Sequence, residues 1–152
     1  MAKKLIFLGD VHLAPWNPGR ADVFFDFIAD QRGEAEAIYI LGDLFDFWVG
    51  AKRLEWAAFL ERLRNLVSDG PPVRVLGGNR DYLLDPPSLE PYGLESLGME
   101  HRFDHDGLRI ALVHGHMRFP NTWFSGLFLR FIQSRSMRRV AHVAPLSWCL
   151  FV

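Results

Sequence analysis

The chain has 152 residues, of which 49% are hydrophobic and 23% charged, a composition that is ordinary for one soluble globular domain with a buried core. A net charge of −1 and an isoelectric point near 6.6 argue against a nucleic-acid-binding protein. Its apolar stretches are too short for a membrane-spanning helix or a secretory signal. The single cysteine, Cys149, excludes an internal disulfide framework and fits a reducing cytoplasm.

The first half of the chain alternates between short apolar runs and amphipathic stretches. The apolar runs predict buried strands at residues 4–9, 37–42 and 73–77. Between them, apolar residues recur at helical spacing, which predicts helices over residues 21–31 and 56–67. This β-α-β-α-β order is typical of parallel strands joined by right-handed crossovers.

The pattern changes after Asp81. Prolines at positions 86, 87 and 91 indicate a loop with a short helix. Residues 99–104 and 108–113 have the character of strands, and the Asp106-Gly107 pair between them is a strong hairpin signal. Because no repeat, low-complexity tract or linker divides residues 1–152, we expect one α/β domain: a sandwich with a parallel β-α-β core and an antiparallel hairpin.

The C-terminal part differs from the rest in charge. All 18 acidic residues lie at or before Asp106, whereas six arginines and no acidic residue occur from Gly107 onward. Residues 123–132 carry an apolar stripe beside arginines, which predicts a basic amphipathic helix within the 120–152 segment. Because the chain ends on the apolar run from Trp148 to Val152, we expect it to stop inside a larger fold.

Polar side chains follow four of the predicted strands. In chain order they are Asp10 and His12, then Asp43, then Asn79 and Arg80, and finally His114. Open α/β sheets place ligands at the carboxyl ends of their strands, so we expect these oxygen and imidazole donors to form one metal centre. A single Gly-Asp after a strand is more often only a turn or a helix cap, but four motifs in succession outweigh that interpretation.

The chemistry of these donors favours particular ions. A carboxylate beside an imidazole suits Mn, Fe, Zn or Co better than Ca, which prefers oxygen alone. Asp43 is the expected hub, because one carboxylate can bridge two ions about 3.5–4 Å apart. Such a pair of ions binds a phosphate ester for in-line attack by water, and Arg80 offers a bidentate phosphate contact that lysine would not reproduce.

Four motifs resemble, in order, the blocks of the calcineurin-like metallophosphoesterases: Gly9-Asp10-Val11-His12, Gly42-Asp43, Gly78-Asn79-Arg80-Asp81 and His114-Gly115-His116. Arg80 stands where most members have histidine. This substitution, together with the stretches 39–46 and 79–84, resembles the branch of UDP-2,3-diacylglucosamine hydrolases. The resemblance covers about residues 4–140. It implies a metallophosphoesterase-type fold. It also implies an enzyme that cleaves the pyrophosphate bond of UDP-2,3-diacylglucosamine to give UMP and lipid X in lipid A biosynthesis.

The resemblance also implies a role for each matching residue. Asp10, His12 and Asp43 would bind one divalent ion, and Asp43 would bridge to a second ion held by Asn79 and His114. The metal in this branch is usually Mn²⁺, and Fe or Zn also suits the donors. Water would attack phosphorus directly, with no covalent enzyme intermediate. Enzymes of the branch work at the cytoplasmic face of the inner membrane, so contact with membrane lipid is implied as well.

Catalysis and substrate binding are assigned in the same way. The implied catalytic residues are Asp43, Asn79, Arg80 and His114, and the implied contacts to the UDP-linked acylated sugar are Asn79, Arg80 and His116. Two departures stand out: His116 replaces the usual aspartate, and the closing GHxH block is absent from the chain. The sequence therefore predicts a truncated or degenerate member that lacks two imidazole ligands.

Alternatives remain for both the C-terminal segment and the activity. Residues 120–152 resemble the start of a lid that holds acyl chains, or they form a helix that simply packs on the sheet. The activity is either that of the branch, or that of another phosphodiesterase or phosphatase acting on nucleotides or phosphoproteins. A third possibility is an inactive fragment, which should bind fewer than two ions per chain.

Overall fold

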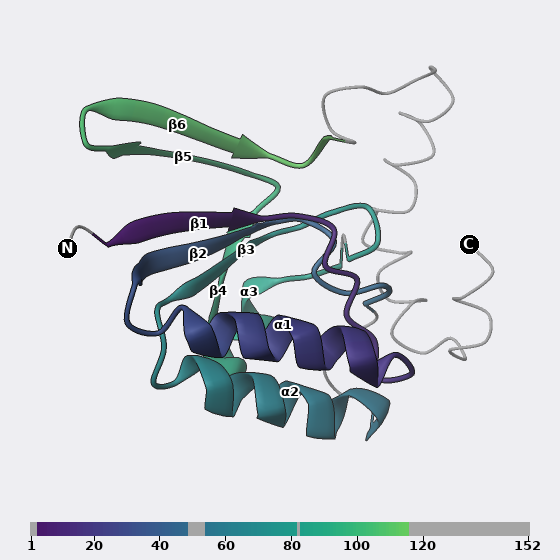
Figure 1. The fold of residues 1–152 in the computed structure, drawn as a ribbon. Helices are drawn as coiled ribbons and strands as arrows, with labels where there is room; N and C mark the ends of the chain where they lie inside the picture. Colours follow the sequence, from purple (N-terminus) through teal and green to yellow (C-terminus); the bar gives the residue numbers. More distant parts are fainter. Residues whose placement is uncertain (1–2, 49–53, 82, 116–152) are drawn as a thin grey trace, which may run out of the picture.

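A four-stranded parallel sheet forms the centre of the fold (Figure 1). The computed structural model describes residues 3–48, 54–81 and 83–115. The strands are hydrogen-bonded in the order β1 (Lys4–Leu8), β2 (Ala35–Leu41), β3 (Val73–Leu76) and β4 (Leu94–Gly98), and every neighbouring pair is parallel. The parallel core expected from the sequence is confirmed.

Two long helices cover one face of this sheet, α1 (Pro18–Asp30) and α2 (Leu54–Val67) (Figure 1). The strands lie in the sheet in the same order as in the chain. Right-handed crossover connections between successive parallel strands therefore place both helices on the same face of the sheet. The helix α1 begins three residues earlier than predicted, since the Asn17 side chain caps it and Pro18 occupies its first turn. The larger apolar core lies between these helices and the sheet.

The opposite face of the sheet is covered by the antiparallel hairpin of β5 (Glu100–His105) and β6 (Leu108–Val113) (Figure 1). Its two-residue turn has positive φ at both Asp106 (48°) and Gly107 (78°), which is the backbone of a type I′ turn. The Tyr39 ring of β2 stacks on the Phe103 ring of β5, with centroids 5.0 Å apart. Helices, sheet and hairpin thus form the expected α/β sandwich.

The strand β4 was not predicted from the sequence, which left residues 94–98 without an assigned element. The preceding short helix is present as α3 (Pro86–Leu89), followed by a 3-10 turn, η1 (Glu90–Tyr92). The sequence of β4 is only five residues long, ends on a glycine and shows little apolar alternation. Its strand conformation comes from pairing with β3, where Val73 lies opposite Leu94.

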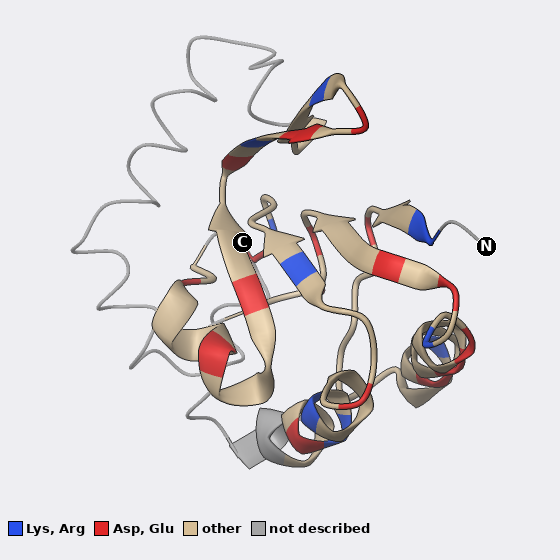
Figure 2. Cartoon of the chain, turned by 90° about the vertical axis from the view of Figure 1, so that its left-hand side faces the viewer, with Lys and Arg blue, Asp and Glu red and all other residues tan. Residues whose placement is uncertain are grey.

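Acidic and basic residues both occur along the described chain, and both α1 and α2 carry residues of each sign (Figure 2). The predicted basic amphipathic helix and lid in residues 120–152 lie outside the described residues, as does His116. Among the residues that are described, no helix has the length and apolar character that crossing a bilayer requires.

Candidate metal centre

The loops that follow β1 and β2 run side by side at the carboxyl end of the sheet. The His12 N–H donates to the Asp43 carbonyl over 2.9 Å, and the Leu13 N–H donates to the Leu44 carbonyl over 2.7 Å. In return, the Asp46 N–H donates to the Leu13 carbonyl over 3.0 Å. Because Leu13 and Leu44 are fully buried, the core holds these two loops together.

The loop after β3 is attached to them by two buried carboxylates. Asp81 accepts hydrogen bonds from the N–H groups of Gly78 (2.6 Å) and Phe45 (3.2 Å). Asp43 accepts one from the Arg80 N–H over 2.9 Å through its Oδ1 atom. These bonds leave the Oδ2 atom of Asp43 as the oxygen that faces the neighbouring imidazoles.

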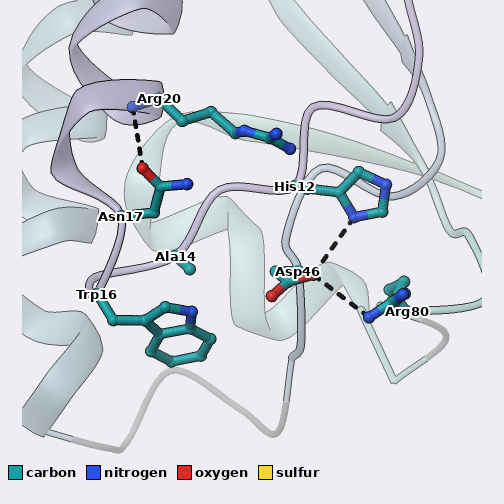
Figure 3. A pocket seen from close by; sticks show the side chains of 7 residues that line it. All are labelled: His12, Ala14, Trp16, Asn17, Arg20, Asp46 and Arg80. Atoms are coloured by element: carbon teal, nitrogen blue, oxygen red, sulfur yellow. Dashed lines mark hydrogen bonds and ion pairs between the residues drawn. The ribbon is translucent and has the colours of Figure 1, made fainter.

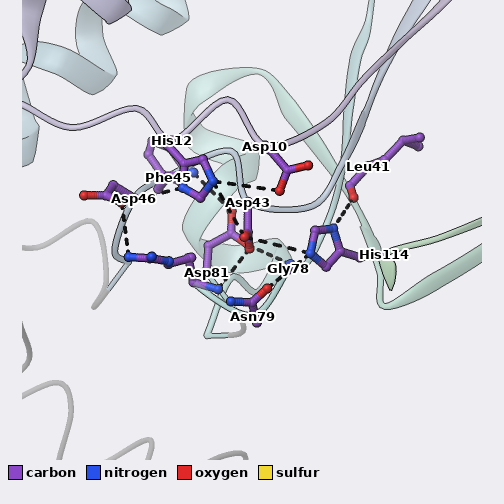
Figure 4. A network of polar contacts seen from close by, with 11 residues as sticks. Asp10, His12, Leu41, Asp43, Phe45, Asp46, Gly78, Asn79, Asp81 and His114 are labelled. Carbon is purple, nitrogen blue, oxygen red and sulfur yellow. Dashed lines mark hydrogen bonds and ion pairs between the residues drawn. The ribbon is translucent and has the colours of Figure 1, made fainter. Parts of the chain in front are cut away.

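A fourth segment, the end of β6, brings His114 to the same place (Figure 4). Its Nδ1 atom lies 2.6 Å from the Leu41 carbonyl oxygen, which can only accept, so Nδ1 carries the proton. The Nε2 atom then lies 3.2 Å from Asn79 Oδ1 and 3.8 Å from Asp43 Oδ2. The four strand ends therefore bring their polar side chains together, as the sequence predicts.

On the other side of Asp43, three side chains form a compact donor group. One ligand atom each from Asp10, His12 and Asp43 lies within 4.8 Å of the other two. The His12 Nε2 atom is 3.8 Å from Asp10 Oδ1 and 4.0 Å from Asp43 Oδ2. The single oxygen Asp43 Oδ2 is thus shared between the imidazoles of His12 and His114 (Figure 4).

The charge and burial of this cluster fit a divalent cation. Asp43 and Asp81 are the buried charged residues of the described chain, with exposed fractions of 3% and 0%. A buried carboxylate is costly unless a cation or several hydrogen bonds compensate it. Carboxylate, amide and imidazole donors converge on Asp43, and transition metals such as Mn or Zn take such mixed sets.

Three residues of the cluster have an uncommon backbone. Asp10, His12 and Asp43 all have positive φ, at 54°, 51° and 52°. Such a conformation costs a side-chain-bearing residue about 1–2 kcal/mol and concentrates at functional sites. The hydrogen bonds between the loops hold it in place, and it turns the three side chains toward one point.

Two glycines permit the close approach of the segments. A Cβ atom on Gly78 would overlap Asp43, and one on Gly42, where φ is +96°, would overlap the His114 ring. These glycines therefore leave room for the Asp43 carboxylate and the His114 imidazole.

Asp81 lies beneath the cluster rather than in it. Burial raises the pKa of its carboxyl group to about 6, the charge of Asp43 acts in the same direction, and the N–H groups of Gly78 and Phe45 oppose the shift. Its two hydrogen bonds tie the β2 and β3 loops together, so its function is to position the loops.

Asp46 was not assigned a role from the sequence, although it is the second acidic residue of the Gly42–Asp46 block. Its Oδ1 atom lies 3.5 Å from His12 Nδ1 and accepts a hydrogen bond from Arg80 Nη1 over 3.3 Å. The buried His12 Nδ1 atom forms no hydrogen bond with any described residue, so the Asp46 carboxylate at 3.5 Å is an ion-pair contact. Asp46 therefore lies beside both the imidazole and the guanidinium.

A pocket of about 330 Å³ opens beside the cluster (Figure 3). The exposed Arg80 guanidinium lines it next to His12 and Asp46, so the predicted phosphate-binding arginine lies at the mouth of the metal centre. The other described residues that line it are Ala14, Trp16, Asn17 and Arg20, which the sequence analysis did not single out.

Comparison with known proteins identifies relatives over nearly the whole chain. The chain is 31% identical over 147 residues to a UDP-2,3-diacylglucosamine hydrolase of Vibrio vulnificus, an alignment that covers 94% of this chain and 56% of that protein. It is 34% identical over 115 residues to the enzyme of the same name from Aliivibrio fischeri, covering 73% and 47%. The chain thus spans about half the length of the curated relatives it matches.

The fold and the family model agree with these relatives. A solved structure of a protein of unknown function from Aquifex aeolicus superimposes with a TM-score of 0.56 at 20% identity, covering 86% of this chain and 73% of that one, and so shows the fold. The model of the calcineurin-like phosphoesterase family matches residues 3–143, which include all four motifs. Members of this family use divalent metals, in keeping with the donor cluster around Asp43. The chain belongs to the calcineurin-like phosphoesterase family.

Proposed function

We propose that this chain carries the catalytic centre of a metal-dependent hydrolase that cleaves the pyrophosphate of UDP-2,3-diacylglucosamine to UMP and lipid X in lipid A biosynthesis. The observation that carries the proposal is the convergence of the His12 and His114 imidazoles on Asp43 Oδ2, at 4.0 and 3.8 Å. Its substrate is supported by the relatives that bear this name at 31% and 34% identity.

The donor groups suggest a division of labour. Asp10, His12 and Asp43 would hold one ion, and Asp43, Asn79 and His114 the other. Mn²⁺ is our proposed metal, with Fe or Zn as alternatives of similar donor preference. Divalent ions bound there supply Lewis-acid stabilisation of the phosphate and activation of water.

Arg80 is proposed to bind the reacting phosphate together with the Asn79 amide. Its guanidinium is about half exposed, so it is accessible from the pocket, and the Asp46 carboxylate at 3.3 Å fixes its direction. A planar guanidinium forms two parallel hydrogen bonds to a phosphate, which a lysine ammonium does not. His116 is proposed as a further substrate contact.

The remaining proposals concern the whole protein. We propose that residues 1–152 belong to one metallophosphoesterase domain, in which 120–152 begin an amphipathic lid for the acyl chains. Such a lid, with its arginines, would bring the enzyme to anionic lipid at the cytoplasmic face of the inner membrane. The mixture of apolar and basic residues in that segment supports this proposal.

The test is hydrolysis of UDP-2,3-diacylglucosamine by the purified chain with added Mn²⁺, beside an Asp43→Asn variant. We expect release of UMP by the wild-type chain and none by the variant. Hydrolysis of nucleotide or phosphoprotein substrates alone would instead favour another phosphodiesterase or phosphatase. No hydrolysis of any substrate, with fewer than two ions bound per chain, would mean that the chain is an inactive fragment.

A further inference from the structure

The pocket beside the metal centre has a second basic wall that the roles above do not use. Arg80 lines one side of the pocket, and Arg20 lies on the other side, at the start of α1 (Figure 3). Trp16, a partly exposed indole, and Asn17 complete this wall. The pocket therefore extends from the His12 side of the metal centre to the first turn of a helix.

The backbone of Arg20 is held firmly by the loop before it. The Asn17 N–H donates to the Ala14 carbonyl over 3.0 Å, which closes the turn that leads into α1. The Asn17 Oδ1 atom then accepts the Arg20 N–H over 3.4 Å as the helix cap. In Figure 3 the Arg20 side chain extends from this fixed point over the pocket, toward His12.

The charges that line the pocket are unbalanced. Among the lining residues that the structure describes, Asp46 is the one carboxylate, and it is already engaged with Arg80 and His12. Arg20 forms no ion pair with any residue in the described part of the chain. Two guanidinium groups that face one pocket repel each other, and a bound anion removes that repulsion.

We infer that Arg20 binds the second phosphoryl group of a pyrophosphate-linked substrate, the group next to the one that reacts. This rests on the proposed function, because it takes the reacting phosphate to be held by the metal centre and Arg80. In a pyrophosphate the two phosphoryl groups share an oxygen, so the neighbouring group extends from the metal centre into the same pocket. Arg20 is thereby a specificity residue that selects pyrophosphates over simple phosphate esters.

The test compares the affinities of UDP and UMP for the 152-residue chain in Mn²⁺, measured by calorimetry. The two ligands differ by one phosphoryl group, so the ratio of their affinities reports how well that group is bound. Complex formation between each nucleotide and Mn²⁺ in solution is the same for every variant and cancels in the comparison. Arg64→Ala serves as the matched control, because Arg64 is an exposed arginine of α2 that pairs with Glu61.

In Arg20→Ala we expect the ratio of UDP to UMP affinity to fall about tenfold, the usual scale for losing a charge-assisted hydrogen-bond pair to phosphate. Arg20→Lys should lose part of this ratio, and Arg64→Ala none. An unchanged ratio in Arg20→Ala, or a wild-type chain that binds UDP no better than UMP, overturns the proposal. This experiment measures binding, so its outcome is independent of turnover. If the affinity ratio falls in Arg20→Ala but the chain does not hydrolyse UDP-2,3-diacylglucosamine, only the proposed function is rejected. If the chain hydrolyses that substrate but the affinity ratio is unchanged in Arg20→Ala, only the phosphate subsite is rejected.

Discussion

His114 and Leu41 are 73 positions apart, yet the imidazole Nδ1–H of His114 donates to the Leu41 carbonyl over 2.6 Å. This bond joins the end of the β5–β6 hairpin to the end of the central strand β2. It also fixes the ring so that Nε2 faces Asp43 and Asn79. A metal-ligating histidine typically donates its other ring nitrogen to a carbonyl or carboxylate in this way.

The first prediction concerns the tautomer of His114. In the metal-free chain, at a pH high enough to keep imidazoles neutral, heteronuclear NMR spectra of the ring nitrogens should show His114 protonated at Nδ1. The reason is that the Leu41 carbonyl can only accept. His114→Ala identifies the signal, and His105, which pairs with the exposed Asp106 carboxylate, is the internal reference. A proton on Nε2 instead would contradict the arrangement.

The second prediction concerns Asp46. Replacing it with alanine removes the carboxylate beside His12 Nδ1 and Arg80 Nη1. Metal affinity should fall about 10–100-fold, the range seen when a residue that orients a ligand is lost. Asp22→Ala is the matched control, since Asp22 is a solvent-exposed carboxylate paired with Arg62 on the outer face of the helices. Equal metal affinity in the two variants would remove Asp46 from the centre.

The third prediction compares the effect of alanine substitution at two glycines of the motifs, Gly78 and Gly9. A Cβ atom on Gly78 would overlap Asp43, whereas one on Gly9 meets nothing within 4 Å. Gly78→Ala should lower the free energy of unfolding by about 1–3 kcal/mol through overpacking and weaken metal binding. Gly9→Ala should change stability by no more than about 0.5 kcal/mol. Denaturant unfolding and metal titration of both variants provide the check. If the two variants lose similar amounts of stability and metal affinity, the overlap with Asp43 is not the cause of the loss in Gly78→Ala.

The fourth prediction follows from the raised pKa of Asp81. The unfolded chain releases this proton near its ordinary pKa of 3.8, but the folded chain holds it until about pH 6. Between these values the folded state binds more protons, so the free energy of unfolding falls as the pH rises, by about 3 kcal/mol in total. Above about pH 7 this contribution is constant.

The measurement is urea unfolding in the presence of a chelator at a series of pH values, for the wild-type chain and Asp81→Asn. The difference between the two free energies of unfolding should decrease from about pH 4 to pH 6 and then level off, because asparagine does not titrate. A difference that does not depend on pH would mean that Asp81 is ionised normally in the folded chain.

The sequence predicts the features that depend on local pattern. The Asp106-Gly107 turn is one, since its two positive φ angles are what that residue pair accommodates. The convergence of Asp10, Asp43 and Asn79 is another, because parallel strands end at one edge of the sheet. The apolar runs of β1, β2 and β3 fix that edge.

Other features depend on contacts between distant segments and have no local signal. The strand β4 forms because Leu94 pairs with Val73 of β3. The left-handed backbone of His12, a conformation that histidine accepts more readily than most residues, is held by its N–H bond to the distant Asp43 carbonyl, which the local sequence does not reveal. Asp81 has a simple sequence signal, an acidic residue after Asn-Arg, but its burial beneath the loops is set by the fold.

The most direct test of the account is a calorimetric titration of the metal-free chain with Mn²⁺, comparing wild type, Asp43→Asn and Asp26→Asn. Asp43 Oδ2 is the oxygen that both imidazoles face, so Asp43→Asn should weaken binding at both donor groups, by at least about tenfold. Asp26→Asn removes an exposed carboxylate of α1 and should bind like the wild type. Unaltered Mn²⁺ affinity in Asp43→Asn would contradict the central claim that Asp43 joins the two halves of one metal centre.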